Sequence, residues 1–221
     1  GALGAVTPGV LRSIYAAVHP RRPVSAALGD AVDEAGVARR VSAAAAVGVA
    51  YVKVGFRRIT SPTRVLALVT AAAHATRARG GGTRVVVVAY ADAARAGSLF
   101  PRTLAGIAAR GGAAGVLLDT AFKDAGGLFE LLAPETVREW VDAAHAAGLT
   151  AGLAGGLGAR DLATAGALGA DLVGVRGAAC DGGRTGCVSR SRVAQLSALL
   201  GTRDTLVERE PQCCHVIDGE H

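Results

Sequence analysis

Residues 84–120, RVVVVAYADAARAGSLFPRTLAGIAARGGAAGVLLDT, hold the pattern that decides the fold. A run of branched apolar residues at 84–91 predicts a buried strand, and a second such run follows at 115–120. Between them, residues 102–110 have the spacing of an amphipathic helix, and Gly111 follows as a helix C-cap does. A strand, a helix and a strand in this order predict two parallel strands joined by a right-handed crossover.

The same alternation of strand and helix extends along most of the chain. Further strands are predicted at 23–28, 50–56, 150–154 and 171–176. Further helices are predicted at 10–18, 65–79, 133–147 and 160–167. Such a chain forms either an open doubly wound sheet or a closed barrel. A doubly wound dinucleotide site needs G-x-G-x-x-G directly after a strand, whereas the nearest match, GLAGG at 152–156, has another spacing and comes late.

Polar residues recur at the C-terminal ends of the predicted strands, which is where TIM barrels build their active sites. These residues are Asp30, Asp92, Asp119 and Arg176. We therefore predict an α/β fold of the TIM (β/α)8-barrel type, with about six of its eight strands present. Residues 1–200 are expected to form this barrel without its first two strands. Residues 201–221 are polar and aperiodic, and they are predicted to form a tail outside it.

The composition argues against several classes of binding partner. The formal net charge is +6, but no basic run exceeds two residues and aromatic residues make up only 4%, so a nucleic-acid surface is not expected. The chain has no apolar run of the about 18 residues that a membrane span needs, and no signal-peptide pattern at 1–10. Four cysteines without a disulfide pattern favour reduced thiols and a cytoplasmic location. Cys213, Cys214 and His215 form a weak metal motif, and we expect no metal.

Lysine is scarce in this chain. Of its 24 basic residues, 22 are arginine, and only Lys53 and Lys123 are lysine. Arginine replaces lysine wherever charge alone is needed, but a guanidinium group does not give up its proton. The two lysines are therefore candidates for chemistry that needs a primary amine, against the alternative that they persist by chance. Both lie on or just after a predicted strand, which weakens that alternative.

Lys53 is predicted to point into the barrel. Along this strand Val52, Val54 and Phe56 share one face, which should pack on the helices, so Lys53 takes the inner face. Burial favours the neutral form of an amine, and a neutral amine can act as a general base near neutral pH. The alternative is an ion pair that fills the interior.

Carboxylates at strand ends supply further candidates. Asp119 falls at the active-site end of its strand, and Lys123 follows four residues later. Asp119 is a candidate to orient an ammonium group or to relay protons, with capping of the loop as the alternative. Asp30 and Asp92 are candidates for contact with the substrate, although Asp92 is equally well placed to cap the next helix.

The last two predicted strands end in glycine-rich turns. Gly155 and Gly156 follow one strand, and Arg176 and Gly177 follow the next. Glycine lets backbone N–H groups approach a phosphate closely, and the final two strands of such barrels frequently hold one. Arg176 would add a charge-assisted hydrogen bond. These residues predict a phosphate site, and the alternative is that the glycines only make tight turns.

Six blocks of the sequence resemble, in order, successive blocks of the (5-formylfuran-3-yl)methyl phosphate synthase family. They are VSAALGD at 24–30, YVKVGF at 51–56, AYADAARAG at 89–97, LLDTAFKD at 117–124, LAGGL at 153–157 and VGVRGAAC at 173–180. No single block would identify the family, but the ordered combination is specific and covers about residues 1–200. The resemblance implies a barrel enzyme similar to class I aldolases.

The implied activity is a lyase-type synthase reaction without a metal or organic cofactor. The family joins two molecules of glyceraldehyde 3-phosphate through a Schiff base into a furan aldehyde phosphate, releasing phosphate and water, and the product feeds the furan core of methanofuran-type carriers. By position, Lys53 matches the family's proton-accepting lysine. Asp119 and Lys123 match its further active-site acid and amine.

One departure from the family pattern leaves alternatives open. The family's Schiff-base lysine lies in an Asp-x-Lys at the end of the second strand, and this sequence contains no Asp-x-Lys. We therefore expect an N-terminally truncated barrel that has little activity alone unless Lys123 forms the imine. The alternatives are another class I aldolase-like barrel acting on a sugar phosphate, or a degraded barrel that binds phosphate without catalysis. The expected partner is a small triose phosphate, and exposed strand edges would favour a homo-oligomer.

Overall fold

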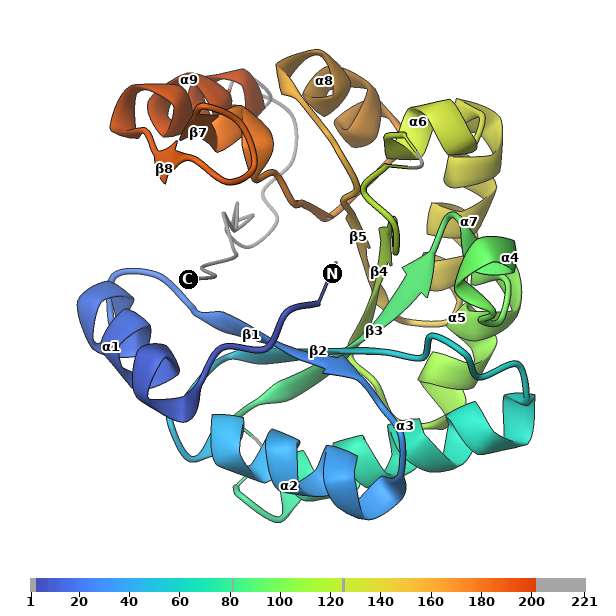
Figure 1. The fold of residues 1–221 in the computed structure, drawn as a ribbon. Helices are drawn as coiled ribbons and strands as arrows, with labels where there is room; N and C mark the ends of the chain where they lie inside the picture. Colours follow the sequence, from blue (N-terminus) through green and yellow to red (C-terminus); the bar gives the residue numbers. More distant parts are fainter. Residues whose placement is uncertain (1–2, 81, 125, 202–221) are drawn as a thin grey trace.

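The computed structural model describes residues 3–80, 82–124 and 126–201 as strands that alternate with helices (Figure 1). Six strands form one sheet: β1 (Ser25–Asp30), β2 (Tyr51–Gly55), β3 (Arg84–Tyr90), β4 (Gly115–Asp119), β5 (Thr150–Leu153) and β6 (Leu172–Val173). Each strand pairs in parallel with the next one along the chain, in the order β1 to β6. The six predicted strands and the α/β class are therefore confirmed.

The sheet curves into an arc with helices along its outer side, as Figure 1 shows for α2, α3, α5 and α7. The strand order ends at β1 and β6, and within the described ranges these two edges do not pair with each other. The arc is thus a parallel sheet of barrel-like curvature that these residues leave open. A closed (β/α)8 ring, and the two further strands it would need, stay a prediction.

Helices follow the strands in turn. The bounds are α1 (Pro8–Val18), α2 (Glu34–Ala45), α3 (Pro62–Arg77), α4 (Ala93–Ala96), α5 (Pro101–Arg110), α6 (Leu128–Leu131), α7 (Pro134–Ala146), α8 (Ala159–Ala167) and α9 (Arg190–Gly201). Proline stands at the start of α3, α5 and α7, where its missing N–H leaves no hydrogen bond unmade. The five helices predicted from the sequence are confirmed to within three residues at each end.

Helix α2 has no counterpart among the predicted elements. Its buried side is limited to Val37, Val41 and Ala44, and alanine and arginine on its other sides blur the apolar period. The usable signal is Asp33, whose side chain accepts a hydrogen bond from the Gly36 N–H at 2.7 Å and caps the helix. Here the cap marks the helix better than the periodicity does.

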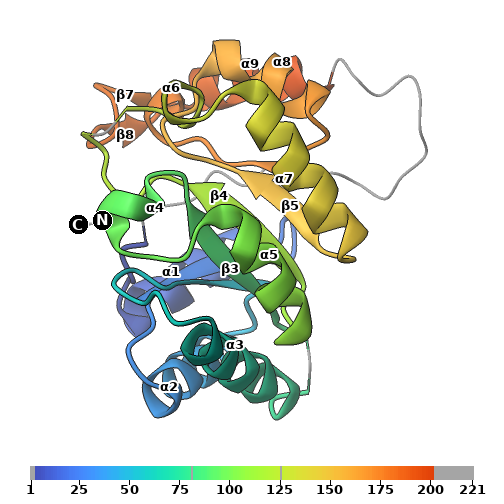
Figure 2. The same cartoon turned by 90° about the vertical axis from the view of Figure 1, so that its right-hand side faces the viewer.

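A small hairpin follows the sheet. Strands β7 (Cys180–Asp181) and β8 (Cys187–Val188) pair in antiparallel fashion after the short 3₁₀ helix η1 (Gly177–Ala179), and α9 follows. Figure 2 shows this hairpin and α9 gathered beside α8, at the β6 end of the arc. Residues 202–221, which include most of the predicted tail and the Cys213–Cys214–His215 motif, lie outside the described residues.

Side chains on the outer face of the sheet pack against the helices, and side chains on the inner face line the inside of the arc. Val52 and Val54 on β2, and Phe56 directly after it, are almost fully buried in the apolar core that the sheet shares with the helices. Tyr51 and Lys53 face the other way, as the alternation predicts, and line the inner side of the arc. No helix within the described ranges is both long enough and apolar enough to cross a bilayer.

Candidate active site

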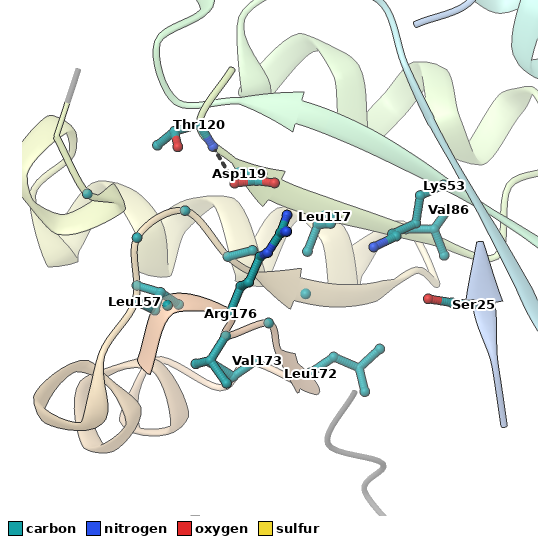
Figure 3. Close-up of a pocket in the computed structure, with 18 of the residues that line it drawn as sticks. Ser25, Lys53, Val86, Leu117, Asp119, Thr120, Leu157, Leu172, Val173 and Arg176 are labelled. Carbon is teal, nitrogen blue, oxygen red and sulfur yellow. Dashed lines mark hydrogen bonds between the residues drawn. The ribbon is translucent and has the colours of Figure 1, made fainter. Parts of the chain in front are cut away.

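A cavity of about 630 Å³ occupies the inner side of the arc. All six strands of the sheet or the loops that follow them contribute to its wall. Figure 3 shows that the Lys53 amine and the Arg176 guanidinium both point into this space, beside Leu117 and Asp119. Three elements that are far apart in sequence thus bring an amine, a carboxylate and a guanidinium to one cavity.

Lys53 occupies the middle of β2, in register with Ala27 of β1 and Val86 of β3. Its side chain is half-buried, and the neighbouring wall of the cavity includes Ser25 and Leu117. Among the residues that the structure describes, the Lys53 amine has no hydrogen-bond or ion-pair partner. The ion pair considered as the alternative is therefore not formed there, and the amine is accessible to a molecule in the cavity.

The Lys123 amine, in contrast, is fully hydrogen-bonded. Its Nζ donates to Asp119 Oδ1 at 3.0 Å, to the Thr120 carbonyl oxygen at 2.8 Å and to the Thr120 hydroxyl at 3.1 Å. Asp119 Oδ1 also accepts the Thr120 backbone N–H at 2.7 Å. An ammonium group has three donors, and all three are used here. Lys123 and Asp119 therefore form a fixed ion pair at the C-terminal end of β4, and Asp119 orients the ammonium as predicted.

The glycine turn after β5 lies directly against this ion pair. Gly155 has φ of +100°, and a side chain on it would place Cβ 2.9 Å from Thr120 Cγ2 and 3.3 Å from Asp119 Oδ1. Gly156 has φ of +68°, and its Cβ would lie 3.0 Å from the Gly127 Cα. Both positions need glycine for conformation and for space. Both also line the cavity, so the tight turn and a phosphate-binding role are compatible.

Arg176 and Gly177 line the same cavity, so four of the six predicted phosphate and substrate contacts come together there. Arg184 joins them, although sequence patterns do not single it out. It follows Gly182 and Gly183, which have φ of +83° and +80° in the turn between β7 and β8. The signal that would have found it is this glycine-rich turn, placed after the last strand of the sheet.

Asp30 lies away from this cavity. Its Oδ1 accepts the Arg57 backbone N–H at 2.9 Å and the Tyr90 hydroxyl at 2.7 Å, and its Oδ2 lies 3.4 Å from Arg57 Nε. These three residues border a second cavity of about 300 Å³. Burial, and then the adjacent carboxylate, raise the pKa of the Tyr90 hydroxyl far above its usual range, so this group stays a neutral donor.

Asp92 also lies away from the main cavity. Its two carboxylate oxygens accept the backbone N–H groups of Ala121 and Phe122, at 2.8 and 2.9 Å. Contact of Asp30 and Asp92 with the substrate stays a prediction, and in the structure each carboxylate has partners within the protein. The sequence places them at strand ends correctly, but it does not reveal which donors face them.

Metal-binding side chains do not gather in this part of the molecule. Within residues 3–80, 82–124 and 126–201, no group of three or more His, Cys, Asp or Glu side chains is close enough to hold a metal ion. Cys180 is buried and Cys187 is exposed, and both are free thiols. The polar side chains that line the main cavity carry amines, guanidinium groups, carboxylates and hydroxyls, and glycine backbone adds to them.

Comparison with solved structures supports the fold. The chain is similar to phosphoribosyl anthranilate isomerase from Thermus thermophilus, with a TM-score of 0.54 and 17% identity over 89% of this chain and 81% of that one. It is also similar to a native KDPGal structure, with a TM-score of 0.51 and 17% identity over 87% and 73%. At such identities these TIM-barrel-like neighbours bear on the fold alone.

Comparison of sequences identifies the family. The family model described as 4-HFC-P synthase matches residues 1–197. The chain is 45% identical to the (5-formylfuran-3-yl)methyl phosphate synthase of Methanopyrus kandleri, over 83% of this chain and 78% of that protein. It is 37% identical to the synthase of the same name from Methanosarcina barkeri, over 90% and 85%. The chain belongs to the 4-HFC-P synthase family.

Proposed function

We propose that this chain carries the site of a (5-formylfuran-3-yl)methyl phosphate synthase, which acts as a lyase in the formation of methanofuran-type carriers. Two molecules of glyceraldehyde 3-phosphate would give one furan aldehyde phosphate, one inorganic phosphate and two molecules of water. The names of the relatives support the product. The observation that carries the proposal is the Lys53 amine, which has no partner among the described residues and shares one cavity with the Asp119–Lys123 ion pair and two arginines.

The charge of the cavity favours phosphorylated substrates. Arg176 and Arg184 line the end of the cavity that the glycine turns also border. Guanidinium groups bind phosphate through paired, charge-assisted hydrogen bonds, and glycine backbone adds N–H donors without steric cost. We assign the phosphate of the triose to this end of the cavity, with Gly155, Gly156 and Gly177 as the backbone contacts.

Lys53 is assigned as the base. When an aldehyde condenses with a primary amine, the iminium that forms acidifies the adjacent carbon. A neutral lysine beside that carbon can take the proton, and the resulting enamine attacks the aldehyde of the second triose to form the new carbon–carbon bond. Loss of phosphate, ring closure and loss of water complete the furan. Lys123, held by Asp119, supplies a fixed positive charge next to the oxygen atoms that gain negative charge.

The amine that forms the imine is assigned from the family pattern to the Asp-x-Lys lysine. No such segment occurs in this sequence, so the test uses two forms of the protein. One is the 221-residue chain, and the other carries an added N-terminal segment with Asp-x-Lys. Each is incubated with glyceraldehyde 3-phosphate, and mass spectrometry follows the furan while a colorimetric assay follows phosphate.

The proposed function predicts the furan and one equivalent of phosphate from at least one form. Borohydride trapping followed by peptide mapping then shows which lysine carries the imine, and the scarcity of lysine makes the map unambiguous. A condensation product that retains both phosphates would point to an aldolase instead. If neither form gives an imine or a product, the site would be one that binds phosphate without catalysis.

A further inference from the structure

Asp92 makes an unusual set of hydrogen bonds for its position. It stands at the N-cap of α4, where an aspartate normally accepts a backbone N–H from its own helix, yet it makes no such bond. Its carboxylate reaches across to the loop that follows β4 and accepts the N–H groups of Ala121 and Phe122. The residue is 9% exposed. A helix cap does not describe this arrangement.

The loop that Asp92 holds is the one that carries Lys123. The Thr120 carbonyl and hydroxyl oxygens accept from the Lys123 amine, so the position of the amine depends directly on the backbone at 120–123. Two consecutive N–H groups in the middle of this segment, at Ala121 and Phe122, are fixed by one carboxylate. On the strand side, the Ala91 N–H donates to the Asp119 carbonyl oxygen at 2.7 Å and continues the register of the sheet.

A second contact between the same two segments lies toward solvent. Arg95 of α4 donates two hydrogen bonds to Asp124, at 3.0 and 2.9 Å, and its guanidinium lies 4.1 Å from the centre of the Phe122 ring. Both partners of this pair are largely exposed, and exposed ion pairs contribute little to stability. The buried Asp92 is therefore the main support of the loop, and the Arg95–Asp124 pair is a natural control.

We propose that Asp92 is a positioning residue, which sets the place of the Lys123 ammonium in the cavity through the backbone of the intervening loop. The inference deepens the proposed function and rests on it. A carboxylate offers an acceptor to each of the two N–H groups, whereas the isosteric amide of asparagine offers one acceptor and one opposing donor. Asp92→Asn therefore breaks one of the two hydrogen bonds at nearly constant volume.

The activity test compares Asp92→Asn and Asp92→Ser with Asp124→Asn in the form that makes the furan. We expect kcat to fall by about tenfold or more in both Asp92 variants with little change in KM, because a misplacement of about 1 Å at a reacting group costs up to about 100-fold. The Asp124→Asn control should stay within about twofold of the parent. Unchanged kcat in the Asp92 variants would overturn the proposal, and so would loss of the folded state in both.

A spectroscopic test does not depend on turnover. A protein labelled with ¹³C,¹⁵N-lysine gives two Nζ signals, because the chain has two lysines, and Lys53→Arg assigns them. Asp92→Asn should shift the Lys123 signal and leave the Lys53 signal in place, whereas Asp124→Asn should move neither. If the parent makes no furan, the proposed function fails while this experiment still decides the role of Asp92. A Lys123 signal that stays unmoved would contradict that role.

Discussion

The two lysines share one cavity but differ in every contact. Lys53 lies in the middle of a strand, and within the described residues its amine has no partner. Lys123 lies in a loop, and all three of its donors are bound to Asp119 and Thr120. An amine without a partner is open to a molecule in the cavity, whereas an amine with three hydrogen bonds is held in one place. Under the proposed function, this difference is the reason to give proton transfer to the lysine on the strand and charge stabilisation to the lysine in the loop.

Lys53→Arg should give the largest loss of activity. Arginine keeps the positive charge but cannot become a neutral base, so kcat should fall by about a thousandfold, within the range typical of a lost general base. Because Lys53 makes no ion pair within the described residues, the melting temperature should change little. Steady-state furan formation and thermal unfolding measure both quantities. A variant with more than about a tenth of the parent kcat would remove Lys53 from the role of base.

Gly155→Ala should disturb the loop lysine from the other side. The positive φ alone costs about 1 kcal/mol of folding stability for alanine, and the new methyl group would also press on Thr120 and Asp119. Gly148→Ala is the matched control, because Gly148 has φ of +73° with open space around its Cβ position. Both variants should unfold at lower temperature, but only Gly155→Ala should lose kcat, by about tenfold. Equal kcat in the two variants would show that crowding of the ion pair does not matter.

The Arg95–Asp124 pair should give the smallest effect. The hydrogen bond from Arg95 lowers the pKa of Asp124. A carboxyl group with a lowered folded-state pKa stabilises the fold above its unfolded pKa, and this contribution disappears as the pH falls through the folded pKa. Asp124→Asn should therefore lower the melting temperature slightly near neutral pH and not in strong acid. Thermal unfolding at the two pH values is the check, and a larger loss in acid would contradict the sign.

The sequence predicts the sheet better than the ligand contacts. Period-two and period-3.6 patterns place six strands and five helices because they record which faces are buried. They fail for helices α2, α4, α6 and α9 and for the β7–β8 hairpin, where a narrow apolar side, a weak apolar period or a very short element leaves no clear pattern. Closure of the barrel and the cytoplasmic location stay predictions.

The residues of the candidate site also fall into those that the sequence predicts and those that it does not. The scarcity of lysine and the strand parity locate Lys53, and glycine spacing locates Gly155 and Gly156, because these signals depend on one residue and its own strand. Asp30 and Asp92 fall at strand ends as predicted, but what occupies their carboxylates is set by neighbouring loops. Arg184 depends on the fold of a hairpin that the sequence patterns do not reveal.

Deuterium exchange tests the central claim most directly. With the furan-forming protein in D₂O, NMR follows loss of the proton on the carbon next to the aldehyde of glyceraldehyde 3-phosphate, with a protein-free sample as reference. We predict fast exchange for the parent and for Lys123→Arg, which keeps the charge, and exchange at the protein-free rate for Lys53→Arg. Exchange that survives in Lys53→Arg and stops in Lys123→Arg would contradict the assignment of the two amines.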